Sequence, residues 1–458
     1  MKRDVIATAL ERAGLPPQAA AAKVQLFERC EALASQLGWN SPEHAWWIPG
    51  RLEVFGKHTD YAGGRTLVAA LPRGVVLLAA TGRASLPGVT VADAVTGEIA
   101  VSNPPERRGG EAIPDVGDRD QQPAWAHYVE AVVRRLQRNF PGALLSANIV
   151  FASDLPAAAG MSSSSALMVG LAAALVRMAG IDSREEWRRN ITGPMDEAAY
   201  YACIENGATF RSLEGDSGVG THGGSEDHAA ILCGAPAQLT AFAFVPLRLL
   251  ATVPVPTEWR FVVASSGVHA EKSGGTRDAY NALAREAAAL LQIWNTHERA
   301  AASLGEALST GTAAPAHLAG LVQRAVGAGA TRDALIRRLT HFVREDGRVP
   351  DAIAAFSAGD AVALADLTRD SQNDAELLLH NQVTETVELA AVARRLGAIG
   401  ASAFGAGFGG SVWAVVEREA APDFAARWLA ACRPACPPGA TAFEASPGPP
   451  LTPLNWSR

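Results

Sequence analysis

The order of apolar and polar positions along the chain predicts helices and strands in alternation. Residues 1–40 carry apolar side chains at helical spacing, whereas the segments RLEVFG, TLVAALP and GVVLLAATG that follow are short apolar runs typical of strands. From Trp125 onward, apolar positions fall at i, i+3, i+4, i+7, i+8 and i+11, which form one face of an amphipathic helix. Between these segments, residues 102–122 are rich in Pro, Gly and charge and are predicted to form a surface loop.

Later in the first half, a strand is joined to a helix through small residues. The predicted strand SANIVFASDLP leads through AAAGMSSSS into the apolar helix ALMVGLAAALVRMAG. This order is typical of an anion site, because a helix N-terminus presents unpaired backbone N–H groups. A further helix is predicted over 197–205, before the glycine-rich loop SLEGDSGVGTHGGS.

A second set of strands and helices begins near Leu247. The strand RFVVASSG, a helix over 279–291, the helix TETVELAAVARRLG, the strand VWAVV and the helix DFAARWLAAC follow in order. The alanine-rich region 297–330 is expected to hold helices with loose connections. We expect the Pro-rich tail after Pro437 to be ordered only where it docks.

Composition narrows the class of protein. A chain of 458 residues is too long for one ordinary core and suggests two large domains. Its net charge of −7 argues against nucleic acid as the main partner, and no segment is long and apolar enough to span a bilayer. The five cysteines are scattered and follow no signal peptide, so we expect free thiols in a reducing cytoplasm rather than disulfides.

The segment LPAAAGMSSSSA carries candidate chemistry. Its backbone N–H groups and the following helix N-terminus can cradle a phosphate, and serine hydroxyls can bind Mg²⁺. A polar helix cap is the alternative. The loop GASAFGAGFGGS indicates close approach of a ligand or of another strand, and Asp227 in GGSEDHAAIL is either a helix cap or a base near a cleft.

Taken together, these loops resemble those of the GHMP small-molecule kinases, and most closely the galactokinases, over nearly the whole chain. PGRLEVFGKHTDYAGG is similar to the galactokinase signature PGRVNLIGEHTDYNGG, and DLPAAAGMSSSSAL is similar to the phosphate loop PxGGGLSSSAS. GASAFGAGFGGS is similar to the third motif GxRMTGGGFGGC. Weaker similarities in the same order are WAHYV to WxNYV, GGSEDH to CGIMDQ and AYNALARE to YNxRRxE.

The resemblance implies a two-domain α+β fold. A domain of the ribosomal protein S5 domain 2 type is expected over 1–245 and a ferredoxin-like domain over 246–458. ATP, Mg²⁺ and a sugar would meet between them, and the anomeric C1 hydroxyl of galactose or a related sugar would be phosphorylated. From the charge, the cysteine usage and the lack of a spanning segment, we expect a cytoplasmic protein without nucleic-acid or membrane partners, and we expect a monomer or weak homo-oligomer.

The resemblance also implies roles for residues. Asp227 matches the catalytic aspartate and Arg51 its partner, which would remove or orient the proton of the anomeric hydroxyl. Ser164 and Glu205 match the Mg²⁺ ligands. The other matched positions are the phosphate cradle Gly160, Met161, Ser162, Ser163 and Ser164, the adenine-pocket Trp125, for which core packing is an equal interpretation, and the sugar-site residues His58, Asp60, Tyr280 and Gly407.

Lys57 departs from the family pattern. Galactokinases carry Glu at this position as an acceptor for a sugar hydroxyl, whereas lysine has three donors and no acceptor. One hypothesis is that Lys57 faces an anionic group on the substrate, such as the C6 carboxylate of galacturonate. The other is that it turns outward, or pairs with Glu53 or Glu226, and the sugar is still galactose.

Two other functions stay open. A catalytically silent, galactokinase-like sugar sensor would keep the fold and lose pieces of the phosphate loop or of the catalytic pair, which are all present here. A kinase of the same superfamily could act on mevalonate, homoserine or a heptose phosphate, although HTDY and AYN favour a sugar.

Overall fold

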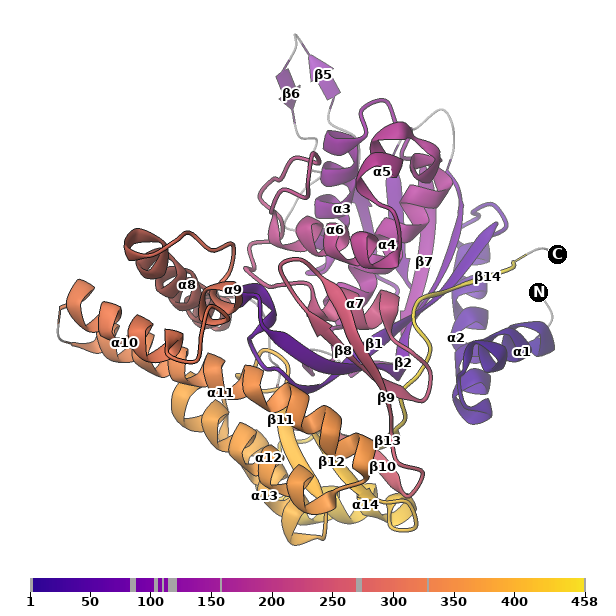
Figure 1. The fold of residues 1–458 in the computed structure, drawn as a ribbon. Coiled ribbons are helices and arrows are strands. Elements are labelled where there is room, and N and C mark those ends of the chain that lie inside the picture. Colours follow the sequence, from indigo (N-terminus) through magenta and orange to yellow (C-terminus); the bar gives the residue numbers. More distant parts are fainter. Residues whose placement is uncertain are drawn as a thin grey trace.

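The structure is a computed structural model that describes residues 3–82, 88–102, 106–108, 111–113, 122–156, 159–268, 274–327 and 329–456. Two large sheets organise the chain, one built mainly from the first half and one from the second (Figure 1). Helices cover both faces of each sheet, so the architecture is α+β in two parts.

The first sheet has the strand order β14-β1-β2-β7-β3-β4, and β8 and β9 extend it from β2. Its longest strands pair antiparallel and are buried along almost their whole length, because helices cover both faces. The bounds are β1 (His44–Phe55), β2 (Arg65–Thr81), β3 (Val89–Asp93), β4 (Ile99–Ser102), β7 (Ala147–Ser153), β8 (Gln238–Ala243), β9 (Arg248–Pro254) and β14 (Thr452–Leu454).

The runs TLVAALP and GVVLLAATG were expected to be separate strands, and this prediction is wrong. They form the single strand β2, which passes through Pro72 without a break. The β1–β2 register shifts between Pro49 and Arg51, so the partners of β1 jump from Gly74 to Ala70. A proline is tolerated there because the ladder is already interrupted.

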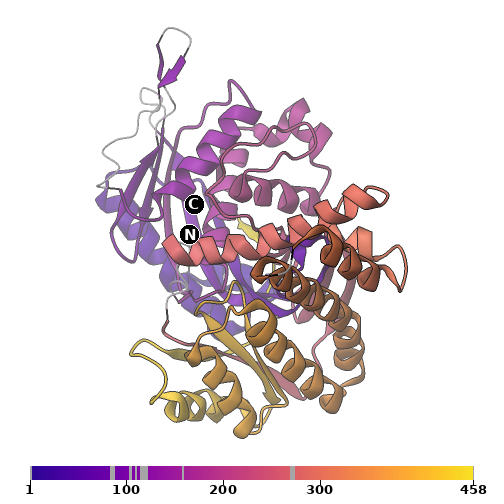
Figure 2. The ribbon, with the colours of Figure 1, turned by 90° about the vertical axis from the view of Figure 1, so that its left-hand side faces the viewer.

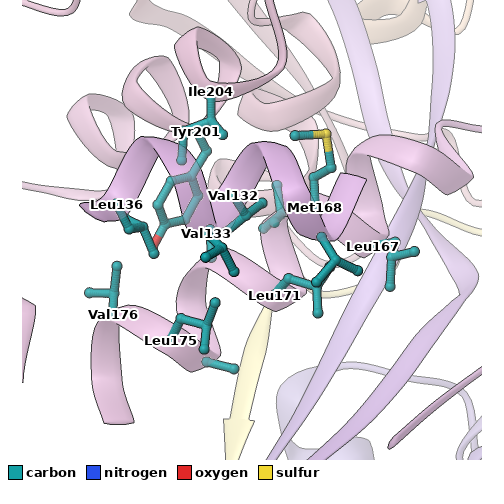
Figure 3. Packing of buried hydrophobic residues seen from close by; sticks show 14 of the residues in the cluster. Val132, Val133, Leu136, Leu167, Met168, Leu171, Leu175, Val176, Tyr201 and Ile204 are labelled. Carbon is teal, nitrogen blue, oxygen red and sulfur yellow. The ribbon is translucent and has the colours of Figure 1, made fainter. Parts of the chain in front are cut away.

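Two groups of helices sandwich this sheet. Helices α1 and α2 pack on one face, while α3, α4 and α6 pack together on the other (Figure 1). Figure 3 shows the second group, where Val132 and Leu136 of α3 meet Leu171 of α4 and Ile204 of α6. The bounds are α1 (Arg3–Ala13), α2 (Pro17–Gln36), α3 (Ala126–Asn139), α4 (Ser163–Met178), α5 (Glu185–Asn190), α6 (Pro194–Asn206) and α7 (Glu226–Cys233).

The second sheet is antiparallel, with the order β11-β12-β10-β13. Helices α13 and α14 cover one face, and α11 and α12 lie against the other and face the first part of the chain (Figure 2). The bounds are β10 (Trp259–Ser265), α11 (Ala330–Ala358), α12 (Ala361–Asp374), α13 (Thr384–Arg395), β11 (Gly400–Phe404), β12 (Ser411–Glu417), α14 (Ala421–Cys432) and β13 (Thr441–Ala445).

The alanine-rich region does hold helices, as expected. Helices α9 (Leu304–Leu308) and α10 (Ala314–Ala325) pack with α8 (Gly274–His297) and the first half of α11 around a small core of their own. Leu290, Leu318 and Leu339 are among its buried residues. This helical unit places α8 beside the turn that follows β1.

The expected domain boundary at 245/246 is wrong in two respects. It cuts the β8–β9 hairpin, although β9 pairs with β8 and belongs to the first sheet. It also assigns the C-terminal tail to the second domain, whereas β14 pairs with Ala45–Trp47 of β1. The first error places the boundary inside a local hairpin, and the second arises because strand pairing joins segments that are distant in sequence.

Composition led us to expect free cysteines and no membrane-spanning segment. All five cysteines are free thiols. No helix in the described ranges is long and apolar enough to cross a membrane. The predicted loop at 102–122 holds the short paired strands β5 (Glu106–Arg108) and β6 (Glu111–Ile113), and most of its other residues lie outside the described ones.

Candidate active site

A cleft of about 660 Å³ lies where the two parts of the chain meet. The first part supplies β1, the turn after it, the N-terminus of α4 and the start of α7, and the second part supplies Tyr280 of α8 and the loop at Gly405 and Ala406. Its size is in the range of small-molecule sites. Most of the residues expected to carry chemistry line it.

The predicted catalytic pair is assembled in this cleft. Arg51 on β1 lies with its Nη2 2.6 Å from Asp227 Oδ1 and its Nε 2.9 Å from Glu226 Oε1. Burial alone would lower the pKa of Arg51, but the carboxylates of Asp227 and Glu226 raise it above its ordinary value. The guanidinium is therefore a fixed positive charge beside Asp227.

Glycine and serine residues form the phosphate-type loop before α4. Gly160 has φ of +71° and Ser162, the N-cap of α4, has φ of +61°. Ser162, Ser163 and Ser164 line the cleft at the helix N-terminus. The buried Ser162 Oγ has no hydrogen-bond partner among the described residues, which suits a loop awaiting a polar ligand.

Met161 does not line the cleft. Its side chain is 1% exposed and belongs to the core between the two sheets. Its carbonyl oxygen instead accepts a hydrogen bond of 3.1 Å from the backbone N–H of Arg51, which ties the loop to β1. Met161 can therefore contribute only backbone atoms to the expected phosphate cradle.

The residues expected to bind Mg²⁺ lie close to the catalytic pair. Glu205 on α6 and Ser164 both line the cleft. Ser165, which sequence reasoning missed, has its Oγ 2.9 Å from Glu205 Oε2 and 3.2 Å from Asp227 Oδ2. Hydroxyl and carboxylate oxygens are the ligands that Mg²⁺ prefers, so this donor set fits the ion.

The turn after β1 lies against the second part of the chain. His58 Nδ1 lies 2.9 Å from the Tyr61 hydroxyl, and Nε2 lies 3.1 Å from the carbonyl oxygen of Ala406. Burial, and then the charge of Arg338, lower the pKa of His58 to about 3. The imidazole is therefore neutral at physiological pH.

Asp60 lines the cleft on the same turn. Its Oδ2 accepts a hydrogen bond of 3.2 Å from the backbone N–H of Glu226. Burial raises the pKa of Asp60 to about 6. Tyr280 also lines the cleft, and its ring lies 5.5 Å from that of His58, so three of the residues expected to contact sugar gather at one end.

The expectation that Lys57 faces the sugar is wrong for this structure. The side chain is 1% exposed and points out of the cleft, where Nζ donates to Ser371 Oγ at 2.6 Å and to Ser402 Oγ at 2.9 Å. Glu345 Oε1 lies 3.9 Å away. The alternatives, an outward lysine or a pair with Glu53 or Glu226, are also wrong, because the lysine is buried and its carboxylate partner is Glu345.

Gly407 does not line the cleft. A side chain there would lie 2.3 Å from the carbonyl oxygen of Asn381, and its φ of +81° favours glycine. Gly405 and Ala406 line the cleft in its place. The third motif thus contributes to the site one and two positions before the residue expected to do so.

Trp125 packs on the core and also lines the cleft, and its place in an adenine pocket stays a prediction. Its ring stands edge-on to Phe151 at 5.2 Å and packs against the core, while it also lines the cleft. Its Nε1 donates to Glu98 at 3.0 Å. His127 and Tyr128 line the same end, which gives this part of the cleft the flat aromatic surfaces that suit a planar base.

Sequence reasoning also missed Glu53 and Thr221 as lining residues. Glu53 is 2% exposed, and its Oε2 accepts a hydrogen bond of 2.6 Å from the N–H of Gly405. Strand alternation could have identified it, since residues i and i+2 share one face and Arg51 was already assigned to the site. Thr221 lies in the glycine-rich loop and had no comparable signal.

Comparison with known proteins identifies matching family descriptions over three segments. These are the galactokinase galactose-binding signature over residues 35–81, the GHMP kinase N-terminal domain over 127–203 and the GHMP kinase C-terminal domain over 352–433. The galactokinase of Mycobacterium bovis is 30% identical over 391 residues, which cover 82% of this chain and 90% of that protein.

Other relatives extend this pattern. The galactokinase of Chloroflexus aggregans is 26% identical over 395 residues, covering 83% of this chain and 86% of that protein. Among solved structures, Lactococcus lactis galactokinase complexed with galactose has a TM-score of 0.72 at 21% identity, covering 93% of this chain and 99% of the other. The likeness in structure confirms the expected two-domain fold.

Proposed function

Since the chain belongs to the galactokinase family of GHMP kinases and is a sugar kinase, we propose that it transfers the γ-phosphoryl group of ATP to the anomeric C1 hydroxyl of galactose or a related sugar. The observation that carries the proposal is the Arg51–Asp227 pair, with Nη2 and Oδ1 2.6 Å apart, in one cleft with the serine loop.

Each side chain of the pair has a defined part. The Asp227 carboxylate accepts the proton of the C1 hydroxyl, or orients it, as that oxygen attacks. Arg51 holds the carboxylate in place and neutralises its charge through a two-nitrogen contact. The sugar oxygen thereby gains nucleophilic character while it is fixed next to the phosphate loop.

Other residues hold the phosphates and the ion. The backbone of Gly160–Ser164 and the N-terminus of α4 would bind phosphate oxygens, and Ser164 and Glu205 would bind Mg²⁺. When bound, Mg²⁺ neutralises charge on the transferred group. Trp125 and its neighbours would hold the base of the nucleotide.

The cleft favours a sugar without a carboxylate over galacturonate. Lys57, the proposed partner of a C6 carboxylate, is directed into the contact with α11 and α12. Arg51 is the only Lys or Arg among the described residues of the cleft, and Asp227 and Glu226 already engage it. A uronate would therefore enter among carboxylates without a cation to pair with.

Assay of the purified protein with Mg-ATP tests the proposal. We expect ADP release that depends on a hexose, with ³¹P NMR placing the new phosphate on C1. Asp227→Asn should lower kcat by about 10²–10⁴-fold without loss of folding, measured by circular dichroism. Sugar-independent ADP release alone, phosphate at another hydroxyl, or phosphorylation of mevalonate in preference to every sugar would overturn it.

A further inference from the structure

The sugar end of the cleft has more carboxyl groups than basic side chains. Four buried or half-buried carboxylates line it, and the guanidinium of Arg51 is the one Lys or Arg side chain among the described lining residues. His58 is neutral, and the ammonium of Lys57 is directed elsewhere. The four carboxylates are Glu53, Asp60, Glu226 and Asp227.

Two of these carboxylates distinguish this chain from the motifs that it resembles. Glu53 stands where the signature PGRVNLIGEHTDYNGG has Asn, and Glu226 stands where CGIMDQ has Met. Glu226 immediately precedes Asp227 in the sequence, and its Oε1 lies 2.9 Å from Arg51 Nε. Relative to these motifs, the chain has two further carboxyl groups, at positions 53 and 226, and lacks the one at position 57.

Among the described residues, Glu226 shares its one cation, Arg51, with Asp227. It is 3% exposed, and Arg51 directs both Nε and Nη2 to Asp227, at 2.8 and 2.6 Å. Glu226 Oε1 makes the ion pair with Arg51 without hydrogen-bond geometry. Burial, and then the like charge of Glu53, raise the pKa of Glu226 well above its ordinary value.

The hydroxyl of Thr221 is a second polar group without a hydrogen-bond partner among the described residues. Its Oγ1 is buried, and Thr221 lines the cleft. Buried hydroxyls in native proteins are nearly always paired, so this group points to a ligand that brings polar atoms. The acidic cluster and the unpaired hydroxyl line the same cleft.

We propose that the preferred substrate is an amino sugar with a free ammonium group, and that Glu226 is the residue that selects it. The inference rests on the proposed sugar 1-kinase function. A ligand cation next to Glu226 supplies the charge that the protein does not, whereas a neutral hydroxyl supplies a weaker partner and a carboxylate is repelled.

The group transfer itself is unchanged by the choice of sugar. The C1 oxygen forms a bond to the γ-phosphorus as the bond from that phosphorus to the β–γ bridging oxygen breaks, and ADP leaves. The proton of the C1 hydroxyl passes to Asp227 and then to solvent. The ammonium group stays intact and serves recognition only.

The test compares galactosamine, N-acetylgalactosamine, galactose and galacturonate with Mg-ATP at pH 7, by kcat/KM. N-acetylgalactosamine is the matched neutral control for galactosamine. We expect galactosamine to exceed galactose by about tenfold or more, and galacturonate to be the poorest. Glu226→Gln and Glu226→Met should each reduce the ratio of galactosamine to galactose about tenfold.

Glu197→Gln is the control variant. Glu197 is a half-buried carboxylate on α6, and burial raises its pKa. It accepts a hydrogen bond from the Tyr201 hydroxyl outside the cleft. It should leave the ratio unchanged. If galactose is phosphorylated as well as or better than galactosamine by the unmodified protein, the inference is overturned while the 1-kinase stands. If no sugar is phosphorylated, the proposed function itself has failed.

Discussion

Ser165 is the residue that joins the two acidic groups of the catalytic centre. Its hydroxyl lies within hydrogen-bond distance of both Glu205 and Asp227, and its side chain is buried. Such a bridge would fix the orientation of the carboxylate proposed to bind metal and of the one proposed to accept a proton. We therefore expect Ser165 to act through its neighbours as a positioning residue.

Replacing this serine tests the bridge. Ser165→Ala should lower kcat by about 10–100-fold and raise the Mg²⁺ concentration needed for half-maximal rate, because both carboxylates lose their shared donor. Steady-state kinetics over a Mg²⁺ titration measure both effects. Ser357→Ala, on an exposed turn of α11, is the control. An unchanged Mg²⁺ requirement would contradict the assigned role.

The serine run also shows where sequence reasoning stops. Four neighbouring serines predict a polar helix start, and that start is found at Ser163. Which hydroxyl faces the acids depends on residues 40 and 62 positions further along the chain, Glu205 and Asp227. No local spacing contains that information. The pair Arg51–Asp227 was predictable only because whole motifs resemble a known family.

Two buried histidines predict a pH dependence of stability. Burial, and then Arg338, lower the pKa of His58 to about 3, and the same two causes lower that of His341 well below its ordinary value. Between pH 6.5 and about 3 the unfolded chain therefore binds more protons than the folded one, and stability falls as the pH falls. Lys57 adds positive charge around both histidines, and Arg348 adds it around His341.

The contribution of one histidine can be isolated. From pH 7 to pH 5, His341 should account for a loss of about 2 kcal/mol in the free energy of unfolding. His341→Asn should therefore show a smaller loss than the unmodified protein by about that amount, measured by urea unfolding at both pH values. Equal losses in the two proteins would show that His341 does not titrate on unfolding.

At the scale of elements, helix α11 holds the turn that follows β1. Glu345 Oε1 accepts from the backbone N–H groups of Gly56 and Lys57, at 3.1 and 3.3 Å. Arg338 donates to the carbonyl oxygen of His58, and Asp346 accepts from the N–H of Arg65 at 2.7 Å. One helix of the second part therefore positions most of a turn from the first.

Lys57 belongs to this contact, so its substitution should affect folding before it affects specificity. Lys57→Glu places a second carboxylate near Glu345 and should destabilise the protein by about 3–5 kcal/mol. Lys57→Met should cost less, because Glu345 keeps Arg348 at 2.9 Å. Urea unfolding measures the relative stabilities of the two variants. A stable Lys57→Glu variant with altered sugar preference would contradict this prediction.

The elements themselves were largely predictable, and their partners were not. The period of apolar residues located α3, and the apolar run after a small-residue loop located α4, because both signals are local in the sequence. The direction of Lys57 depends on Ser371 and Ser402, which are 314 and 345 positions away. Its charge suggested contact with a ligand, whereas in the structure it lies at the contact between the turn after β1 and the second part of the chain.

For the whole molecule, the last strand returns the chain to its first sheet. β14 pairs with β1, Leu451 N–H donates to the carbonyl oxygen of Ile231, and the ring of Trp456 lies 5.5 Å from Phe27 of α2. Leu454 and Trp456 are both buried. The C-terminal tail is therefore a structural part of the N-terminal half.

Removal of the tail should destabilise the sheet that carries Arg51. Deleting residues 450–458 exposes the apolar surface that Leu454 and Trp456 cover, and we expect a loss of about 3–6 kcal/mol from these two side chains. Urea unfolding measures it, with Leu377→Ala, a leucine 66% exposed, as the control. A deletion as stable as the control would show that the tail contributes nothing.

The position of β14 has a consequence for synthesis of the chain on the ribosome. β1 emerges long before β14, yet its edge at Ala45–Trp47 has no partner until residues 452–454 have been translated. The second sheet can close before the first is complete, since all its strands precede β14. The two ends of the chain finish side by side (Figures 1 and 2), so a circularly permuted gene that joins them would deliver β14 and β1 together and remove this wait.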